Sequence, residues 1–410
     1  MWRLANQVRS YAWGSTTAIP RLLGVEPTGQ PQAELWLGAH GSAPSHIVTA
    51  TGSVALDTAI AECPQEMLGE EVALRFGKRL PFLLKLLAAQ EPLSLQAHPS
   101  SERAQRGYAA ENAAGIALDA PHRNYKDPFH KPELVLALED FQALCGFRPP
   151  AHALAELEGL TSDLAVALRT DLAAPTAEAA LRAAMTRLLT LPREHRADAV
   201  AALVSELARR TEHCGHSGNV TVALDLAQRY PGDPGAVAAL LLNHLTLAPG
   251  EALFLPAGNV HAYLSGTAVE VMACSDNVLR AGLTPKHVDA EELLDVVDFA
   301  VLPIPYVHAQ HETAPGRLDY RPDIADFALS VISPDSTSVP EHSACRLPEG
   351  PVIVLALEGA VRLSDATGTT GLTLERGESA FVPASHGRIE VDGQGRVITA
   401  AVGQVGAAQM

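Results

Sequence analysis

A repeated strand pattern constrains the fold of this chain more than any other feature. Residues 245–257 read LTLAPGEALFLPA, and residues 372–384 read LTLERGESAFVPA. Each copy has an alternating apolar stretch, a Gly-Glu turn and a second apolar stretch that ends in Pro-Ala. Short antiparallel strands joined by glycine turns are typical of jelly-roll barrels. The repeat therefore predicts two such barrels in one chain.

Residues 149–234 carry a different pattern. Ala and Leu recur at helical spacing in stretches such as ADAVAALVSELARR, and Pro175 and Pro192 interrupt them. Because strand-like sequence resumes near residue 235, we expect an all-helical insertion within the first barrel. The predicted fold is mainly β, with two cupin-like jelly-roll barrels and a helical domain. We expect these boundaries: a catalytic barrel at 1–148 and 235–305, the helical insertion at 149–234, and a C-terminal barrel at 306–410.

Composition limits the possible partners. The chain has 410 residues, of which 47% are hydrophobic, and a formal net charge of −17. This length is more than one ordinary core needs, so two or three domains are expected. The negative charge argues against nucleic acid or an anionic membrane surface as a partner, because both would be repelled. A small anion could still bind in a cleft that gathers the few cations.

The sequence also indicates a cellular compartment. The first fifteen residues, MWRLANQVRSYAWGS, lack the apolar core of a secretory signal, and no apolar run is long enough to span a bilayer. The five cysteines are odd in number and widely scattered, and none forms a CxxC pair. This usage fits reduced thiols. We expect a cytoplasmic protein, a monomer, whose metal ligands are not thiolates.

Candidate metal ligands interrupt several of the expected strands. In SLQAH, Ser94, Gln96 and His98 alternate, so on a strand they share one face, which suits a cleft, a polar network or a metal. Glu133 opens the apolar run LVLAL, where a buried carboxylate needs a partner; a salt bridge with a lysine or arginine is the simpler alternative. His261 follows a turn. Two imidazoles, a carboxylate and an amide oxygen suit Zn²⁺ in a catalytic role.

The chain resembles the type I mannose-6-phosphate isomerases, a family of the cupin superfamily. Five segments carry the resemblance, in family order: YAWGS at 11–15, AELWLGAH at 33–40, PFLLKLLAAQEPLSLQAHP at 81–99, NYKDPFHKPEL at 124–134, and PAGNVHAY to SDNVLRAGLTPKHVD at 256–289. The resemblance implies that one zinc ion is bound by Gln96, His98, Glu133 and His261. It also implies a catalytic Arg280 and the interconversion of mannose 6-phosphate and fructose 6-phosphate through an enediol.

Two positions depart from the family pattern. The motif QAHP continues as Ser100, Ser101 and Glu102, where the family often has a lysine, and YAWGS has Ala12 where an acidic residue is usual. The phosphate anchor is therefore left open. We expect catalytic roles for Arg280, Lys131 and His130, the last in ring opening. Substrate binding is expected from Lys85, Ser94, Trp13, Asp276 and Lys286. The identity of the base also stays open.

Two other functions fit parts of this pattern. A cupin oxygenase draws similar ligands from a barrel but uses iron and needs no phosphate anchor. A sugar-phosphate-binding regulator on an inactive cupin would lack metal ligands. In the second copy of the repeat, Arg388 stands where His261 stands in the first, and no QAH motif precedes it. We therefore expect the C-terminal barrel to hold no metal.

Overall fold

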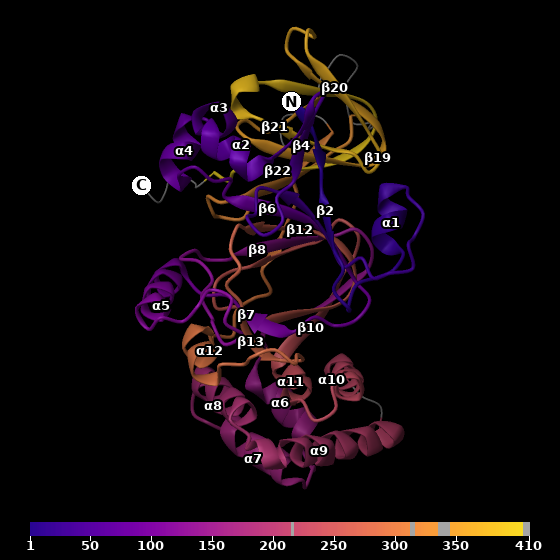
Figure 1. Cartoon of the computed structure of the whole chain (residues 1–410). Coiled ribbons are helices and arrows are strands. Elements are labelled where there is room, and N and C mark those ends of the chain that lie inside the picture. The colour runs from indigo at the N-terminus through magenta and orange to yellow at the C-terminus, as the bar shows by residue number, and fades with distance from the viewer. Residues whose placement is uncertain (215–216, 312–315, 335–344, 405–410) are drawn as a thin grey trace.

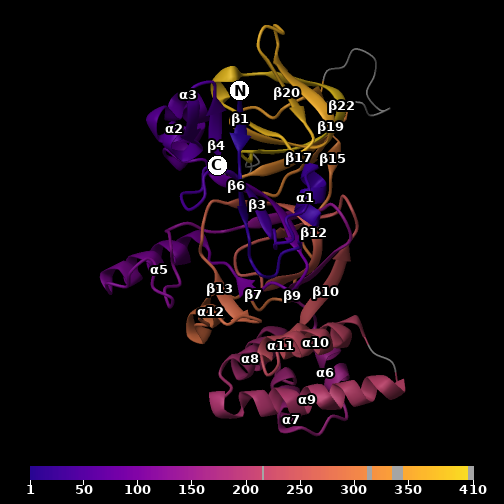
Figure 2. The same cartoon turned by 45° about the vertical axis from the view of Figure 1, so that its right-hand side comes forward.

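Two antiparallel sheets and a layer of helices follow one another along the length of the molecule (Figures 1 and 2). The computed structural model describes residues 1–214, 217–311, 316–334 and 345–404. A C-terminal barrel lies at the top of both views, a central barrel in the middle and the helical insertion at the bottom. The expected fold class, mainly β with a helical insertion, is confirmed.

The central barrel is organised around the long strand β12. This strand pairs with β6 and β8 along one part of its length and with β7 and β9 along the other. Its residues are almost entirely buried, as expected for a strand with neighbours on both edges. The strands of the central barrel are β2 (Gln7–Arg9), β3 (Glu34–Gly38), β6 (Phe82–Ala89), β7 (Leu95–Ala97), β8 (Glu133–Ala137), β9 (Phe141–Phe147), β10 (Leu242–Leu247), β11 (Ala252–Leu255), β12 (His261–Ala273), β13 (Leu279–Gly282) and β14 (Tyr306–Val307).

The C-terminal barrel includes strands from the very start of the chain. β1 pairs with β21 in the register Trp2 to Phe381, and β4 and β5 extend the same sheet. The expected boundary placed all of residues 1–148 in the catalytic barrel, whereas these three strands join the other sheet. The strands are β1 (Trp2–Ala5), β4 (His46–Thr49), β5 (Gly52–Ala55), β15 (Gln310–His311), β16 (Arg317–Tyr320), β17 (Ala328–Ile332), β18 (Cys345–Arg346), β19 (Val352–Asp365), β20 (Gly371–Glu375), β21 (Ser379–Val382) and β22 (Ile389–Ala401).

Half of the helices in the described residues belong to the insertion. Helices α6 to α11 form the insertion, and their apolar faces share one buried core with residues of the central barrel such as Leu144 and Leu279. The helices are α1 (Ala18–Leu23), α2 (Leu56–Glu62), α3 (Pro64–Leu68), α4 (Glu70–Phe76), α5 (Ser101–Ala113), α6 (Pro150–Leu157), α7 (Asp163–Leu172), α8 (Ala177–Leu189), α9 (Arg193–Cys214), α10 (Gly218–Arg229), α11 (Pro234–Ala238) and α12 (Ala290–Val296), with 3-10 turns η1 (Ala239–Leu241) and η2 (Ala384–His386). Within the described ranges, no helix combines the length and apolarity that crossing a lipid bilayer requires.

Candidate functional site

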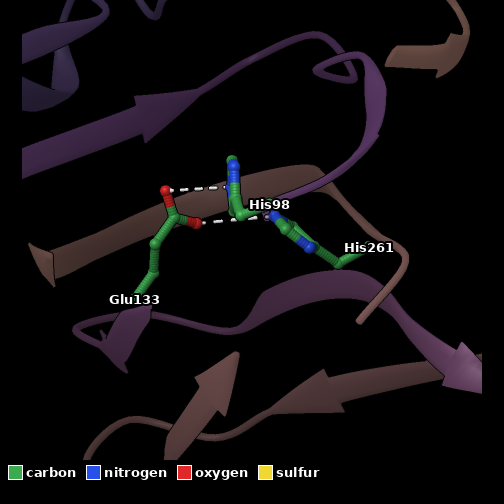
Figure 3. A group of neighbouring side chains, drawn as sticks. All are labelled: His98, Glu133 and His261. Atoms are coloured by element: carbon green, nitrogen blue, oxygen red, sulfur yellow. Dashed lines mark ion pairs between the residues drawn. The ribbon is translucent and has the colours of Figure 1, made fainter. Parts of the chain in front are cut away.

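Three buried side chains from distant parts of the sequence meet inside the central barrel (Figure 3). His98 follows β7, Glu133 opens β8 and His261 opens β12. Their candidate ligand atoms all lie within 4.8 Å of one another. The Nε2 atoms of His98 and His261 are 3.3 and 3.4 Å from the two carboxylate oxygens of Glu133. His261 pairs with Gln96 of β7, two residues before His98, whereas Glu133 pairs with Met272 near the other end of β12, so Glu133 reaches the two histidines from another part of the sheet.

Backbone carbonyls fix the orientation of both imidazoles. The Nδ1 atom of His98 donates to the carbonyl of Asn277 at 2.8 Å, and that of His261 donates to the carbonyl of Asn259 at 3.1 Å. Asn277 is itself held by its side-chain amide, which donates to the carbonyl of Phe129 at 2.8 Å. A histidine that donates Nδ1–H to a carbonyl presents the lone pair of Nε2, which is the usual arrangement around a bound metal.

Gln96 lies at the edge of this cluster. Its side-chain amide is 3.4 Å from Nε2 of His261, and the hydroxyl of Ser94 donates to its Oε1 at 3.4 Å. The two ends of a glutamine amide are assigned from such contacts. Rotation of the amide would bring its oxygen next to Nε2 of His261. The expected amide ligand thus contacts one of the three clustered residues.

The protonation states of the cluster suit a cation. Burial lowers the pKa of His98 to about 4, so its imidazole is neutral near pH 7. Burial opposes ionisation of Glu133, but the charge of Lys131, 3.1 Å away, and the two imidazoles hold its pKa well below the usual value. Nε2 of His98 and Oε2 of Glu133 make no hydrogen bond within the described structure. Buried polar atoms without hydrogen bonds are costly, and a catalytic Zn²⁺ fits this donor set.

A cleft of about 610 Å³ opens beside the cluster. Most of the expected site residues line it: Trp13, Lys85, Ser94, Gln96, Lys131, Glu133, Asp276, Arg280 and Lys286. His130 lines a separate cavity, where its Nε2 is 3.0 Å from a carboxylate oxygen of Asp326. Successive side chains of an extended segment point to opposite sides, so His130 is turned away while its neighbour Lys131 faces the cleft.

One lysine of the cleft is held by two carboxylates that the sequence analysis missed. Nζ of Lys85 is 2.8 Å from Glu270 and 3.8 Å from Glu34, and all three side chains are buried. Although burial opposes its charge, Glu270 and Glu34 raise the pKa of Lys85. Glu270 could have been found from its place in the apolar strand VEVMA, by the same argument that identified Glu133. Lys85 therefore carries a fixed positive charge.

Two other cations of the cleft have no partner among the residues that the structure describes. The side chains of Arg280 and Lys286 make no hydrogen bond or ion pair with any residue that the structure describes. Burial lowers the pKa of Arg280, and burial followed by the charge of Arg280 lowers that of Lys286. A partly buried guanidinium without a counter-charge is unfavourable. This end of the cleft is therefore suited to an anion.

Asp276 and Trp13 lie on other walls of the cleft. A carboxylate oxygen of Asp276 is 3.3 Å from Nε2 of His40, and this contact lowers the pKa of Asp276 although burial opposes the change. The ring of Trp13 stacks on that of Tyr11, with 5.7 Å between ring centroids. The cleft thus combines polar groups, a flat aromatic surface and cations.

The barrel and its buried site define a cupin-type protein with a metal centre beside a cleft for a small anion. Residues 1–150 match the family model described as phosphomannose isomerase type I, catalytic domain. The mannose-6-phosphate isomerase of Escherichia coli (strain K12) is 42% identical over 404 residues, which cover 97% of this chain and 98% of that protein. The chain belongs to the type I phosphomannose isomerase family.

Solved structures agree with this membership. A crystal structure of a mutant phosphomannose isomerase from Salmonella typhimurium has a TM-score of 0.89 and 38% identity, and the match covers 98% of this chain and all of that one. A crystal structure of mannose 6-phosphate isomerase described as holo and zinc bound has a TM-score of 0.88 and 38% identity over 98% of this chain and 99% of that one.

Proposed function

We propose that this protein interconverts mannose 6-phosphate and fructose 6-phosphate and uses one zinc ion per chain. One observation carries the proposal: Glu133, a member of the buried cluster with His98 and His261, lines the same cleft as the cations Arg280 and Lys286. Metal chemistry and anion recognition are thus available to one small substrate. The names of the relatives and the zinc-bound structure support the same activity.

The reaction moves a proton between C1 and C2 of the sugar through an enediol. It needs stabilisation of the oxygen that becomes negative, a group that carries the proton, and an anchor for the phosphate. Zinc, when bound by Gln96, His98, Glu133 and His261, supplies a Lewis acid that polarises the carbonyl. The other requirements fall to the side chains of the cleft.

We assign Arg280 to the negative charge that develops in the transition state. A guanidinium stays protonated near neutral pH, so it is a poor base and a good donor to an oxyanion. Lys286 is the proposed phosphate anchor, since it lies at the same end of the cleft and lacks a counter-charge. It takes the place of the cation that is missing at Ser100, Ser101 and Glu102.

Lys131 is the proposed proton carrier. Its Nζ lies 3.1 Å from Oε1 of Glu133, so a metal ligand holds it next to the reacting atoms. Lys85 is less suited to this role, because its two carboxylate partners keep it protonated. We assign to Lys85 a fixed positive charge in the cleft. His130 faces Asp326 in another cavity, and this geometry does not support a part in ring opening.

The remaining residues of the cleft are proposed to hold the sugar. Ser94 and Asp276 offer groups that bind hydroxyls, and Trp13 offers a ring face for the apolar side of the sugar. We further propose a monomer located in the cytoplasm. Light scattering coupled to gel filtration tests the first statement, and cell fractionation tests the second.

The decisive experiment measures metal content and fructose 6-phosphate turnover of the purified protein. We expect about one zinc per chain, loss of turnover after chelation and recovery when zinc is added back. Full turnover by metal-free protein would overturn the proposal. Turnover that depends on oxygen and on iron instead would favour the oxygenase alternative.

A further inference from the structure

The segment that carries both unpaired cations passes through an unfavourable backbone conformation. Arg280 lies on β13, which pairs with β7 as far as Gly282. The next residue, Leu283, has φ of +57°, and it is the only residue other than glycine with positive φ among those described. Leucine is rarely found in this left-handed region, and such residues persist only where their surroundings hold them.

A single carboxylate of the helical insertion holds this turn. Asp233 is the N-cap of α11, where its Oδ1 accepts a hydrogen bond from the backbone N–H of Gly235 at 2.8 Å. Its Oδ2 accepts the backbone N–H of Leu283, also at 2.8 Å. Both oxygens are therefore used, one within the insertion and one on the segment of the cleft. Hydrogen bonds to an ionised acceptor are about twice as strong as neutral ones.

The approach is close enough to require a glycine. Gly282 has φ of +146°, and a Cβ built there would lie 2.7 Å from Oδ1 of Asp233 and 2.9 Å from Cα of Gly235. Leu283 itself is only 2% exposed and belongs to the apolar core shared with the insertion. The backbone of residues 282–283 therefore packs closely against the start of α11, with no room for a larger side chain at Gly282.

The residues that follow Leu283 border two cavities. Residues 284–286 line the substrate cleft, and together with Asp233 and Arg196 they also line a second cavity of about 460 Å³. Lys286 therefore gains little support from packing. Arg280, in contrast, is fixed by strand pairing with Gln96. The two cations are held by different means.

We infer that Asp233 is a positioning residue through which the helical insertion sets the place of Lys286, and with it the affinity for the phosphate of the substrate. The inference rests on the proposed function, in which Lys286 anchors that phosphate. It assigns to the insertion a direct part in substrate binding. Arg280 is placed by the pairing of β13 with β7, so we expect Asp233 to affect it less than Lys286.

The test separates the two roles of Asp233, which are capping of α11 and the hydrogen bond from the backbone N–H of Leu283. In Asp233→Ser the hydroxyl still caps the helix, because serine is a good N-cap, but one short oxygen cannot also reach Leu283. We expect this variant to raise both the KM for fructose 6-phosphate and the Kd of inorganic phosphate by about tenfold. Zinc content and kcat should change little. Asp233→Asn keeps the shape with a single acceptor, and we expect the same direction of change.

A double-mutant cycle decides whether Asp233 acts through Lys286. If it does, Asp233→Ser combined with Lys286→Ala should have nearly the KM of Lys286→Ala alone. The matched control is Asp171→Asn, which breaks the ion pair of Asp171 with Arg187 inside the insertion, away from the cleft. This control should keep the wild-type KM even if its melting temperature falls.

Three results would overturn the inference. They are a wild-type KM and phosphate Kd in Asp233→Ser, additive effects in the double mutant, and an equal rise of KM in Asp171→Asn. Failure of the proposed function is distinguishable, because it would appear as no turnover in the wild-type protein. Phosphate binding, measured by calorimetry on the zinc-loaded protein, judges the role of Asp233 without relying on turnover.

Discussion

Arg280 on β13 stands directly opposite Gln96 on β7 in the strand register. His261 on β12 pairs with the same Gln96 from the other edge of β7. Three neighbouring strands thus bring the arginine assigned to catalysis beside two of the proposed zinc ligands. A guanidinium has no lone pair to offer a cation, so Arg280 cannot be a metal ligand. Its contribution can therefore be separated from metal binding by mutation.

Arg280→Ala should keep zinc and lose most turnover. The variant removes a donor for the developing negative charge without touching a proposed ligand, and loss of such a donor costs about 10²–10³ in kcat. His98→Ala and His261→Ala should instead lose zinc and activity together. Metal analysis and kcat on the same preparations check this. Zinc loss in Arg280→Ala equal to that in His261→Ala would contradict the assignment.

Lys85→Met should destabilise the fold as well as the activity. It leaves Glu270 and Glu34 buried without their cation, and breaking a buried ion pair costs about 3–5 kcal/mol. Adding Glu270→Gln should restore part of this stability but not the turnover. Urea unfolding at pH 7 gives the free energies. Equal stability of the single and double variants would show that the pair does not act as a unit.

Lys286→Ala should raise the KM for fructose 6-phosphate by about tenfold and change kcat less, because it removes an anchor remote from the reacting carbons. Inorganic phosphate should compete with the substrate in the wild-type protein and less well in the variant. Lys78→Ala is the matched control, since Lys78 is exposed and lies outside the cleft. A wild-type KM in Lys286→Ala would require another phosphate anchor.

The metal-free protein should lose stability on mild acidification. Burial lowers the folded-state pKa of His98 from 6.5 to about 4, so between these values the unfolded chain binds more protons. The free energy of unfolding therefore falls as pH drops through this window, by about 2 kcal/mol from pH 7 to pH 5. His98→Gln should lack this part of the dependence. Urea unfolding at each pH gives the free energies. If the free energy of unfolding changed with pH equally in the wild-type protein and in His98→Gln, the expected pKa shift of His98 would be refuted.

Much of the architecture was predictable because its signals are local. The repeated LTL–Gly-Glu–Pro-Ala pattern corresponds to β10 and β11 in one barrel and to β20 and β21 in the other. The Ala and Leu spacing of residues 149–234 gave the helices of the insertion. The pairing of Trp2 with Phe381 could not be predicted this way, because nothing in either strand alone identifies a partner so distant in sequence.

The residues of the site were likewise predictable only where the signal is local. His98, Glu133 and His261 were recognisable because each is a polar residue in an apolar strand within a specific motif. The sequence could not show which of two adjacent side chains faces the cleft. His130 and Lys131 are neighbours, yet only Lys131 lines the cleft. Asp233 lies in none of the matching segments, and Glu34, although it lies in AELWLGAH, has nothing in the sequence that links it to Lys85. Their importance comes from what folding brings next to them.

The pairing of β1 with β21 joins two strands that are far apart in the order of synthesis. Residues 2–5 are synthesised long before their partner strand at residues 379–382. Until then the edge of β1 has exposed N–H and C=O groups, which can recruit other strands. A fragment cut near residue 305 would keep every proposed zinc ligand and still expose this edge. We expect such a fragment to aggregate, and that result would make the C-terminal barrel a folding partner that the catalytic barrel requires.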